Sequence, residues 1–430
     1  MILKPSILNP KRLLIAIVGL VICGGLVWYC ARVGFARTLA KVAVITGNSP
    51  TADLAVTWSP SDAETHFTRG QVLQQSQQYN DVASELARAV QLRPRDYYLW
   101  LELGLARDQN QDQEGALRAF RQAVELAPFY ANGHWKLGNL LLRMGQVEQA
   151  FTELRKASSS NPALLTNLAN LAWGVYGSDT SAVEAAVAPG SDAERMALAI
   201  VFAKHGANRE AVNQFTLSSA AESDAKTLLE LFMQSRAFNE AYLVWAKLHG
   251  ATSNLTDALG TMRDGSFEGP VLVGDQGFGW QITTIANVKL SVDASNPQTG
   301  ARSLRIDFRG NSEPQTSILN QLVLTKADNR YRLVFFARAQ QFVSAALPIV
   351  TVVDASSRAG TILGQSSAIP SDFPDWREFV IEFTAGSQTS AVTVNVRRQS
   401  CPDDPCPAFG AIWLDSFRIE SPGVSGNKKD

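Results

Sequence analysis

The 430-residue sequence has no excess of charge of either sign and contains few histidines. Its 39 lysines and arginines nearly balance its 40 aspartates and glutamates, so the formal net charge is −1 and no global field attracts nucleic acid or an anionic membrane surface. The four histidines all lie before residue 250, and no phosphate loop, nucleophile elbow, metal-binding helix motif or dinucleotide fingerprint occurs. The sequence therefore predicts a protein that is not an enzyme and that has no nucleic acid partner.

Cysteine is scarce as well, and the four cysteines fall into two pairs. Cys23 and Cys30 lie in an apolar N-terminal run, where we expect them to pack. Cys401 and Cys406 bracket a short Pro-Asp-Asp-Pro loop and predict a disulfide, which requires an oxidising compartment. A metal site at these two cysteines is less favoured, because no histidine follows His249.

The stretch Leu13–Ala31 contains no charged residue and is about long enough to cross a bilayer as a helix. Trp28 and Tyr29 lie near its end, where amphipathic rings favour the membrane interface. We predict that residues 1–32 form an N-terminal tail and an uncleaved transmembrane anchor, followed by a juxtamembrane helix end and a spacer at 33–60. A cleaved signal peptide is the alternative, although its apolar region usually has about 7–15 residues.

Basic residues flank this stretch equally on both sides, so they do not decide its orientation. The expected disulfide favours a cytoplasmic N-terminus, with the remainder of the chain outside the cytoplasm. We therefore expect a single-pass protein of the inner (cytoplasmic) membrane, with the bulk of the chain periplasmic or extracytoplasmic.

Residues 63–162 repeat themselves with a period of 34. Gly70, Gly104 and Gly138 have this spacing (104 − 70 and 138 − 104), and two further sets keep it: Ala89, Ala123 and Ala157, and Pro94, Pro128 and Pro162. A fixed period in this range indicates a solenoid, in which each unit buries its apolar face on its neighbours. Small residues let two helices approach closely, and each proline ends a helix, so we expect every unit to be a pair of antiparallel helices.

This pattern resembles the tetratricopeptide repeat. The family's positions are occupied in the second unit by Trp100, Leu103, Gly104, Ala116, Phe120, Ala123 and Pro128, and in the third by Leu137, Gly138, Leu141, Ala150, Leu154, Ala157 and Pro162. The first unit is looser, with Arg69 where leucine is usual. Helical patterning continues beyond Pro162, so we expect about six hairpins over residues 61–255, in a right-handed superhelical arc.

The resemblance implies that a protein partner binds the concave face, which the first helices of the units line. On the family register, the candidate protein-binding residues are Gln71, Gln74, Gln75, Asp108, Gln109, Asn139 and Arg143. Asn139 and Arg143 lie one helical turn apart, as a pair that grips a carboxylate requires. The alternative is a solvated helix face without a ligand.

From about residue 265 the hydrophobic pattern alternates with a period of two, interrupted by glycine, proline, asparagine and serine. The expected strands are 287–292, 303–308, 317–324, 331–339, 349–353, 378–383, 391–396 and 411–419. They predict an all-β sandwich of the jelly-roll type at residues 265–421, with a disordered tail at 422–430. The fold class is therefore multidomain, α then β: a transmembrane helix, an all-α tetratricopeptide superhelix and an all-β jelly-roll sandwich.

Several short strings resemble the carbohydrate-binding jelly rolls of the galactose-binding-like superfamily, and they occur in that family's order. They are 266–269 (Ser-Phe-Glu-Gly), 278–280 (Phe-Gly-Trp), 299–304, 331–333, Trp376 and 412–415 (Ile-Trp-Leu-Asp). The resemblance implies a structural calcium ion held by Glu268 and Asp415, whose oxygens suit Ca²⁺. It also implies that Trp280, Trp376 and Trp413 belong to the framework of the fold.

A glycan site on this domain requires exposed planar hydrogen-bonding groups. The candidates are Gln321, Arg332, Arg338, Arg397 and Arg398, of which Arg332 and Arg338 share a face of one expected strand. Basic side chains suit an acidic glycan or a lipid-linked phosphate sugar, but they suit a solubilising sheet face equally well.

Together these features indicate a non-catalytic scaffold of the bacterial cell envelope. In this hypothesis the protein recruits another protein through the repeats and docks on polysaccharide through the sandwich, in the assembly or export of a surface polysaccharide. The alternative is a protein-only scaffold for secretion or envelope-complex assembly, in which the sandwich is purely structural.

Overall fold

The computed structural model describes residues 10–75, 77–219, 221–269, 277–401 and 405–420. It divides into two compact units, Met1–Ala188 and Pro189–Asp430. The boundary lies within the region expected to hold the helical repeats, and not between residues 255 and 265. The last helical hairpins therefore belong to the same unit as the β domain. The tail expected at 422–430 lies outside the described residues.

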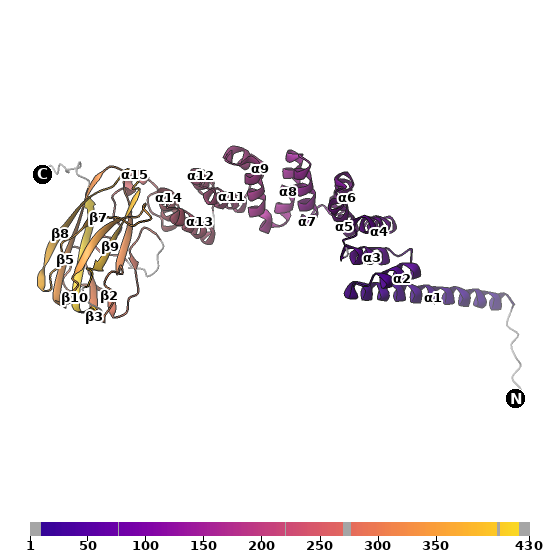
Figure 1. The fold of residues 1–430 in the computed structure, drawn as a ribbon, viewed down its shortest axis with the longest axis horizontal. Helices are drawn as coiled ribbons and strands as arrows, with labels where there is room; N and C mark the ends of the chain where they lie inside the picture. Colours follow the sequence, from indigo (N-terminus) through magenta and orange to yellow (C-terminus); the bar gives the residue numbers. More distant parts are fainter. Residues whose placement is uncertain (1–9, 76, 220, 270–276, 402–404, 421–430) are drawn as a thin grey trace, which may run out of the picture. The chain divides into compact units, whose positions relative to one another are not determined.

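The first unit consists of helices joined by short turns (Figure 1). They are α1 (Pro10–Thr46), α2 (Ser49–Trp58), α3 (Ala63–Gln75), α4 (Tyr79–Leu92), α5 (Tyr97–Gln109), α6 (Gln113–Leu126), α7 (Ala131–Arg143), α8 (Val147–Ser160), the 3₁₀ turn η1 (Pro162–Leu164), α9 (Leu165–Tyr176) and α10 (Thr180–Val187). The helices pack in sequential pairs, of which α3/α4, α5/α6 and α7/α8 are the three units expected from the period of 34.

Equivalent positions of these three hairpins have equivalent surroundings. Each glycine of the period faces an apolar side chain that lies 16 positions later in the second helix (86 − 70, 120 − 104 and 154 − 138): Gly70 faces Leu86, Gly104 faces Phe120 and Gly138 faces Leu154. Since glycine has no side chain, the two helices of each hairpin approach closely at this level. The period therefore reflects one packing arrangement that is used three times.

Helix α1 is a single helix of 37 residues, and it contains the one stretch among the described residues that is long and apolar enough to cross a membrane. The apolar first part of α1 is exposed, whereas Ala36, Ala40 and Ala43 are buried where α1 packs on α2 and α3. These alanines recur at i, i+4 and i+7 and so form one helix face. The juxtamembrane helix end expected within 33–60 is present as the end of α1, but the spacer expected after it is not, because α2 occupies residues 49–58.

The second unit begins with further helices and continues into the β domain. Its helices are α11 (Asp192–Lys204), α12 (Asn208–Thr216), α13 (Glu222–Ser235), α14 (Phe238–His249) and the short α15 (Leu255–Ala258). Helix α11 starts with a capping box, in which the Ser191 hydroxyl accepts from the Glu194 N–H and the Glu194 carboxylate accepts from the Ser191 N–H. Helices α11/α12 and α13/α14 pack as two more hairpins.

The β domain contains two antiparallel five-stranded sheets (Figure 1). The strands are β1 (Gln281–Ile282), β2 (Val288–Asp293), β3 (Ser303–Asn311), β4 (Leu319–Leu324), β5 (Arg330–Val343), β6 (Pro348–Asp354), β7 (Ile362–Gln365), β8 (Phe373–Thr384), β9 (Ala391–Arg398) and β10 (Pro407–Glu420). One sheet has the order β1-β4-β9-β6-β7 and the other β2-β3-β10-β5-β8. All eight expected strands are present; β1 and β7 were not expected. The predicted fold class, helical repeats followed by a β sandwich, is confirmed.

The inner faces of the two sheets form one apolar core. Ile306, Phe335 and Ile412 of one sheet and Val352 and Val394 of the other belong to it, and all five side chains are fully buried. Side chains at alternate positions of the same strands point away from this core, so each sheet also has an outer face.

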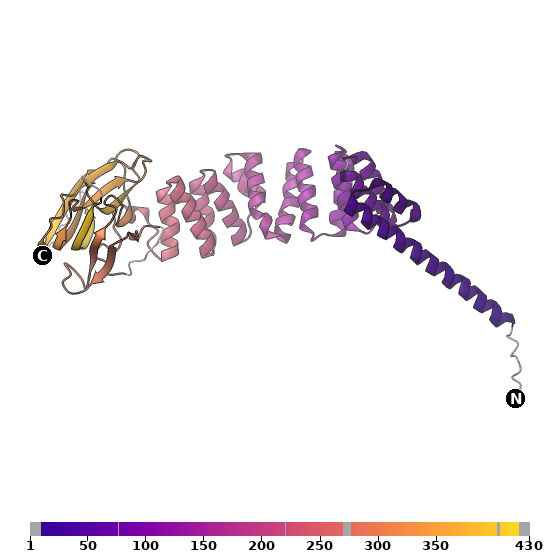
Figure 2. The same cartoon turned by 60° about the horizontal axis from the view of Figure 1, so that its bottom comes forward.

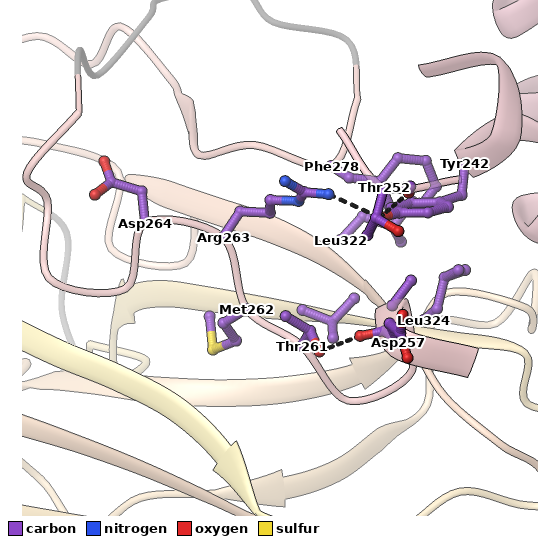
Figure 3. A pocket seen from close by; sticks show the side chains of 12 residues that line it. Tyr242, Thr252, Asp257, Thr261, Met262, Arg263, Asp264, Phe278, Leu322 and Leu324 are labelled. Carbon is purple, nitrogen blue, oxygen red and sulfur yellow. Dashed lines mark hydrogen bonds between the residues drawn. The ribbon is translucent and has the colours of Figure 1, made fainter. Parts of the chain in front are cut away.

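The last hairpin of helices packs directly against the β domain. The Tyr242 and Trp245 rings of α14 contact Phe278, with ring centroids 5.1 and 5.7 Å apart. Arg263 lies over Trp245 and donates from Nη2 to the Tyr242 hydroxyl at 2.7 Å (Figure 3). This aromatic contact explains why α11–α15 and the β domain form a single compact unit.

Candidate binding surfaces

The first helices of the three regular hairpins carry the residues that the sequence proposed for protein binding. On α3, Gln74 and Gln75 are exposed and Gln71 is half-buried. On α5, Gln109 is exposed and Asp108 is half-buried. All of these side chains therefore lie on an accessible helix surface in the first unit.

The two residues proposed to grip a carboxylate are both engaged within the protein. Arg143 Nη2 lies 2.7 and 2.6 Å from the two carboxylate oxygens of Asp108, so α7 is joined to α5 by an ion pair. Asn139 Nδ2 donates to the backbone carbonyl of Trp135, one turn earlier, at 2.7 Å. A ligand carboxylate would have to displace Asp108 before it could bind Arg143.

Two further charged residues of the same helices, Glu102 and Lys136, lie close enough to influence each other electrostatically. Burial raises the pKa of Glu102 on α5, while the Tyr98 hydroxyl and the Lys136 ammonium act in the opposite direction. Like Asp108 and Arg143, Glu102 and Lys136 belong to neighbouring hairpins. The face of α5 and α7 thus carries charges of both signs, which favours a partner with mixed polarity over a strongly acidic or basic one.

In the β domain, the sequence proposed Gln321 as an exposed glycan-binding residue, but the structure does not place it on the surface. It is fully buried; Oε1 accepts from the Arg263 N–H at 2.9 Å, and Nε2 donates to the Arg263 carbonyl at 2.8 Å. Gln321 therefore satisfies a backbone segment beside the edge of β4 and has a structural role. This position is corrected accordingly.

Arg332 and Arg338 lie on the outer face of the β2-β3-β10-β5-β8 sheet, as expected from their parity. Arg332 is paired with Glu420 and Glu378 at 3.2 and 3.5 Å. Arg338 is mostly covered and lies between two indoles, 4.1 Å from the Trp413 centroid and 5.4 Å from that of Trp376. Their charge is neutralised or covered within the sheet, which does not suit recognition of an acidic glycan.

The tryptophans differ in their environments. Trp280 is part of the core, as expected for a framework residue. Trp413 is buried on the outer face, where its indole N–H donates to Asp293 at 2.6 Å. The hydrogen bond from the Ser295 hydroxyl and the weaker effect of the bond from the Trp413 indole lower the pKa of Asp293 to about 2. Trp376 is half-buried and donates to the Asn296 carbonyl at 3.1 Å.

The two consecutive arginines at the end of β9, Arg397 and Arg398, lie on opposite faces of the sheet and differ in their hydrogen bonds. Arg398 is 1% exposed and donates to the Ser344 hydroxyl at 2.9 Å and to the Cys406 carbonyl at 3.0 Å, so it is a buried structural residue and not a glycan ligand. Cys406 is disulfide-bonded to Cys401, as the sequence predicted. Arg397 points to the outer face of the other sheet, and its Nε atom has no hydrogen-bond partner among the described residues.

That other sheet carries a row of polar side chains that the sequence reading missed. Directly paired residues form this polar row, which crosses all five strands: Gln281 of β1, Asn320 of β4, Asn395 of β9, Thr351 of β6 and Gln365 of β7. Their sequence neighbours Val352, Val394 and Val396 face the core, so the polar row lies on the other side of the sheet. There Gln365 is exposed, Gln281, Asn320 and Asn395 are half-buried, and Thr351 is fully buried. The signal in the sequence was the alternation of Val and Asn along β9, but the pairing between strands is visible only in the structure.

The hydrogen-bonding capacity of the polar row is only partly used. Asn395 Nδ2 donates to the Thr393 carbonyl at 3.1 Å, and Gln281 Nε2 donates to the Gly277 carbonyl at 3.1 Å. The buried Thr351 hydroxyl has no hydrogen-bond partner within the described residues. Arg397 Nε is also buried without a hydrogen-bond partner among the described residues. Two buried, unpaired polar atoms, Thr351 Oγ1 and Arg397 Nε, therefore lie on the face of the sheet that carries the polar row.

Glu268 and Asp415 do not fit a calcium ion. Asp415 is fully buried, and its oxygens accept backbone N–H groups of Gln298 at 2.8 Å and Ser416 at 2.6 Å. Glu268 Oε1 accepts the Ala301 N–H at 2.8 Å. Oxygens that face N–H donors are poorly oriented for a cation, and no cluster of three potential metal-ligating side chains occurs in the described part of the chain. These carboxylates close the 298–302 loop instead.

The pocket between α14 and β4 also has a structural explanation. Its volume is about 300 Å³, and its lining includes Tyr242, Phe278 and Leu322 (Figure 3). The charged residues at its rim are engaged: Arg263 with Tyr242, as described above, and Asp257 with the Asn254 side chain at 2.9 Å. The pocket is therefore part of the contact between the helices and the β domain.

Comparisons with known proteins identify the regular hairpins. The family model of the tetratricopeptide repeat matches residues 97–130 and 131–164, which correspond to α5/α6 and to α7/α8 with η1. Residues 97–164 are two tetratricopeptide repeats. The preceding hairpin α3/α4 has the same glycine contact at the same spacing, so the tetratricopeptide packing begins one hairpin earlier than the matched region.

Similar solved structures include a crystal structure of MamA that is 19% identical, covers 44% of this chain and 90% of its own, and has a TM-score of 0.28. A fragment of MamA from Desulfovibrio magneticus RS-1, residue 41 to the end, is 23% identical, covers 31% of this chain and 75% of its own, and also has a TM-score of 0.28. Scores this low carry no argument about partner or activity. None of the curated proteins matches the chain.

Proposed function

We propose that this chain is a membrane-anchored, non-catalytic scaffold of the bacterial cell envelope that binds a protein through its repeats and glycan through its β domain. The tetratricopeptide repeats support the protein-binding part, because stacked helical hairpins present an extended surface for a partner. The polar row supports the glycan-binding part. Together they suggest a role in the assembly or export of a surface polysaccharide.

The continuity of α1 supports an uncleaved anchor. A signal peptide is removed from the mature protein, and a cut after the apolar stretch would fall inside one uninterrupted helix whose second part packs on α2 and α3. The Cys401–Cys406 disulfide supports a position of the β domain outside the cytoplasm. We therefore infer a single-pass protein of the inner membrane with its bulk in the periplasm.

The polar row suits an uncharged chain of hydroxyl groups better than it suits a peptide. An amide side chain offers both donors and an acceptor, as a sugar hydroxyl requires in its partner. Strands in a sheet are about 4.8 Å apart, so the four intervals between five strands extend over about 19 Å. The backbone groups of a sheet face are already paired within the sheet, so an extended peptide could add to an edge but not to this face.

Binding of polysaccharide by the full chain in lipid nanodiscs tests this proposal. A panel of neutral and acidic bacterial polysaccharides is titrated against the wild type, against Asn320→Ala with Asn395→Ala, and against Arg332→Ala on the other sheet as a matched control. We expect loss of binding in the double variant and unchanged binding in the control. Wild-type protein that binds no member of the panel would contradict the glycan-binding part of the proposal.

The protein-only scaffold remains the second candidate, and a specific observation favours it. Gln321, Arg332 and Arg338, the side chains proposed from the sequence for glycan, are all occupied by contacts within the protein. In this case the β domain is structural or docks on protein, and neither the wild type nor any variant binds glycan in the same experiment.

A further inference from the structure

The exposed aromatic side chains of the first unit gather outside the apolar stretch of α1. Six large aromatic residues of this unit are more than a third exposed beyond residue 31, and Phe129 reaches 87%. We refer to them as the aromatic edge: Phe35, Trp58, Tyr97, Tyr98, Phe129 and Tyr130. Exposed aromatic rings in such number on one surface indicate a binding surface.

All six belong to one edge of the helical hairpins. Trp58 is the last residue of α2, Tyr97 and Tyr98 begin α5, and Phe129 and Tyr130 form the connection between α6 and α7. Phe35 joins them because its ring lies 5.0 Å from that of Trp58. The turns at the opposite edge, near residues 47–48, 77–78, 110–112 and 144–146, contain no exposed aromatic side chain in the described part of the unit.

The rings continue from the anchor helix into the repeats. Tyr98 lies 5.8 Å from Phe67 of α3, and Tyr97 lies 5.1 Å from Tyr130 in the next hairpin. A polar bridge fixes the α4–α5 connection next to α1, because Asp62 accepts from both Arg37 at 2.7 Å and Arg93 at 3.3 Å. Because α2 runs back along α1 from the turn at 47–48, its end at Trp58 lies on the side of the hairpins from which α1 extends. Figure 2 shows α1 projecting beyond the helices that follow it.

The length of α1 places the start of this edge at the depth of the lipid headgroups. The uncharged stretch ends at Ala31, and Phe35 follows four residues later, about 6 Å further along a helix that rises 1.5 Å per residue. The headgroup layer of one leaflet is about 5–8 Å thick, taken as half the difference between the full bilayer and its hydrocarbon core. Phe35 and Trp58 thus lie where aromatic side chains are favoured in membrane proteins.

We propose that the aromatic edge docks on the headgroup layer of the membrane that α1 crosses, so that the first repeats lie against the bilayer surface. This inference rests on the proposed anchor and adds a second lipid contact to it. The occupant is lipid because the edge is continuous with the membrane helix. The exposed Arg32 and Arg95 flank the edge and complement anionic headgroups.

Fluorescence quenching by labelled lipids tests this proposal on the full chain in nanodiscs, with a quencher on the acyl chain for the anchor and a quencher in the headgroup for the repeats. In a background of Cys23→Ser and Cys30→Ser, single cysteines carry the fluorophore at Leu20 in the anchor, at Asn132 beside Tyr130, and at Gln113 on the opposite edge. We expect quenching at Leu20 by the acyl-chain quencher, quenching at Asn132 by the headgroup quencher, and no quenching at Gln113 by either. Adding Tyr97→Ala and Phe129→Ala should abolish the quenching at Asn132, whereas Val42→Ala and Ile45→Ala should not.

The outcomes separate the two proposals. An unquenched label at Leu20 would mean that the anchor itself does not cross the bilayer, which contradicts the proposed function. Quenching at Leu20 without quenching at Asn132 would overturn only the docking of the aromatic edge and would point to a protein as the occupant. Quenching at Asn132 that survives removal of the two aromatic side chains would also overturn it, because proximity to lipid would then not depend on them.

Discussion

Gly104 lies so close to Phe120 that a β-carbon on residue 104 would be 2.5 Å from two carbons of the phenyl ring. The equivalent β-carbon on Gly138 would be 2.6 Å from Leu154 Cγ, whereas that on Gly70 would be 3.4 Å from Leu86 Cγ, an ordinary contact distance. One position of the repeat therefore tolerates a methyl group in the first hairpin and not in the next two.

This difference predicts the effect of alanine at the three glycines. Removing glycine from a helix interior gains about 0.5–1 kcal/mol, and forcing an extra methyl group into a packed interior costs about 1–3 kcal/mol. We expect Gly70→Ala to leave stability unchanged or raised, and Gly104→Ala and Gly138→Ala to lower it. Hydrogen exchange of amides in the three hairpins measures the effect locally. Equal destabilisation by all three substitutions would contradict the packing described here.

The turn inside each hairpin predicts a second matched series. Gln77, Gln111 and Gly145 occupy equivalent positions and have φ angles of 57°, 64° and 75°. This left-handed conformation costs about 1–2 kcal/mol for residues with a side chain and almost nothing for glycine. Gln111→Gly should therefore stabilise the second hairpin by up to about 1 kcal/mol, and Gly145→Gln should destabilise the third. Hydrogen exchange of amides in the second and third hairpins measures the change in local stability. If Gln111→Gly destabilised the second hairpin, Gln111 would not be under backbone strain.

His66 should titrate above the ordinary histidine range. Its Nε2 faces the Pro60 carbonyl at 3.0 Å, so it carries a proton, and its Nδ1 lies 2.7 Å from the Glu85 carboxylate. The hydrogen bond to Glu85 raises the pKa of His66, against a smaller opposing effect of burial. Arg69, which is paired with Glu85, and Arg88 are the nearby cations.

A raised pKa in the folded state means that His66 stabilises the fold fully below its unfolded pKa of about 6.5, and that this contribution is lost as the pH rises through the folded pKa. NMR titration of ring-labelled histidine measures it directly, with His66→Asn for assignment. We expect a midpoint above 6.5 that falls in Glu85→Gln, where the charge of the partner is removed. An unchanged midpoint in Glu85→Gln would contradict the assignment of the cause.

The disulfide between Cys401 and Cys406 should contribute measurably to the β domain. The two cysteines are five positions apart, and closing a loop this short restricts the unfolded chain by about 2 kcal/mol in the entropic model. We expect reduction, or Cys401→Ser with Cys406→Ser, to lower the free energy of unfolding of the β domain by this amount. Thermal unfolding followed by the signal of the buried tryptophans measures it, with the untreated protein as control.

The same cysteines report on the compartment. Cys23 and Cys30 are replaced by serine, and cells with a permeabilised outer membrane and an intact inner membrane are treated with a membrane-impermeant maleimide. We expect Cys401 and Cys406 to be labelled when a reductant has been added and not to be labelled without it. Labelling that requires lysis of the inner membrane would place the β domain in the cytoplasm and contradict the proposed topology.

The repeats could be predicted from sequence because their packing depends on side-chain size at fixed intervals. Gly104 and Phe120, and Gly138 and Leu154, face each other inside one hairpin, so the contact is local and its period is visible in the sequence. The strands were predicted for a similar reason, since alternation along a strand such as β9 follows directly from its two faces.

The segment after the apolar stretch differs from the expectation because the start of its helix resembles a break. Gly47 and Pro50 suggested an irregular spacer. In the structure Asn48 caps α2 by accepting the Thr51 N–H, and Pro50 lies in the first turn, where its missing N–H costs nothing. The same residue types end one helix and begin the next.

The polar residues of the β domain could not be assigned from sequence alone. Gln321 and Arg398 are residue types that usually lie on the surface. In the structure Gln321 accepts from the backbone of Arg263, 58 positions away, and Arg398 donates to the backbone carbonyl of Cys406. The polar row depends on the register between strands, which brings Asn320, Asn395 and Thr351 side by side. A single strand contains no information about that register.

The uninterrupted course of α1 has a mechanical consequence. If α1 crosses the bilayer as we propose, its apolar stretch of 19 residues is about 28 Å long, and it tilts in a membrane whose hydrocarbon layer is thinner than that. Since the same rigid rod supports the first hairpin through Ala36, Ala40 and Ala43, with no hinge between them, any change of its inclination is passed on to the repeats. The thickness of the lipid layer around the proposed anchor would thereby bias the direction in which the repeats present their surface.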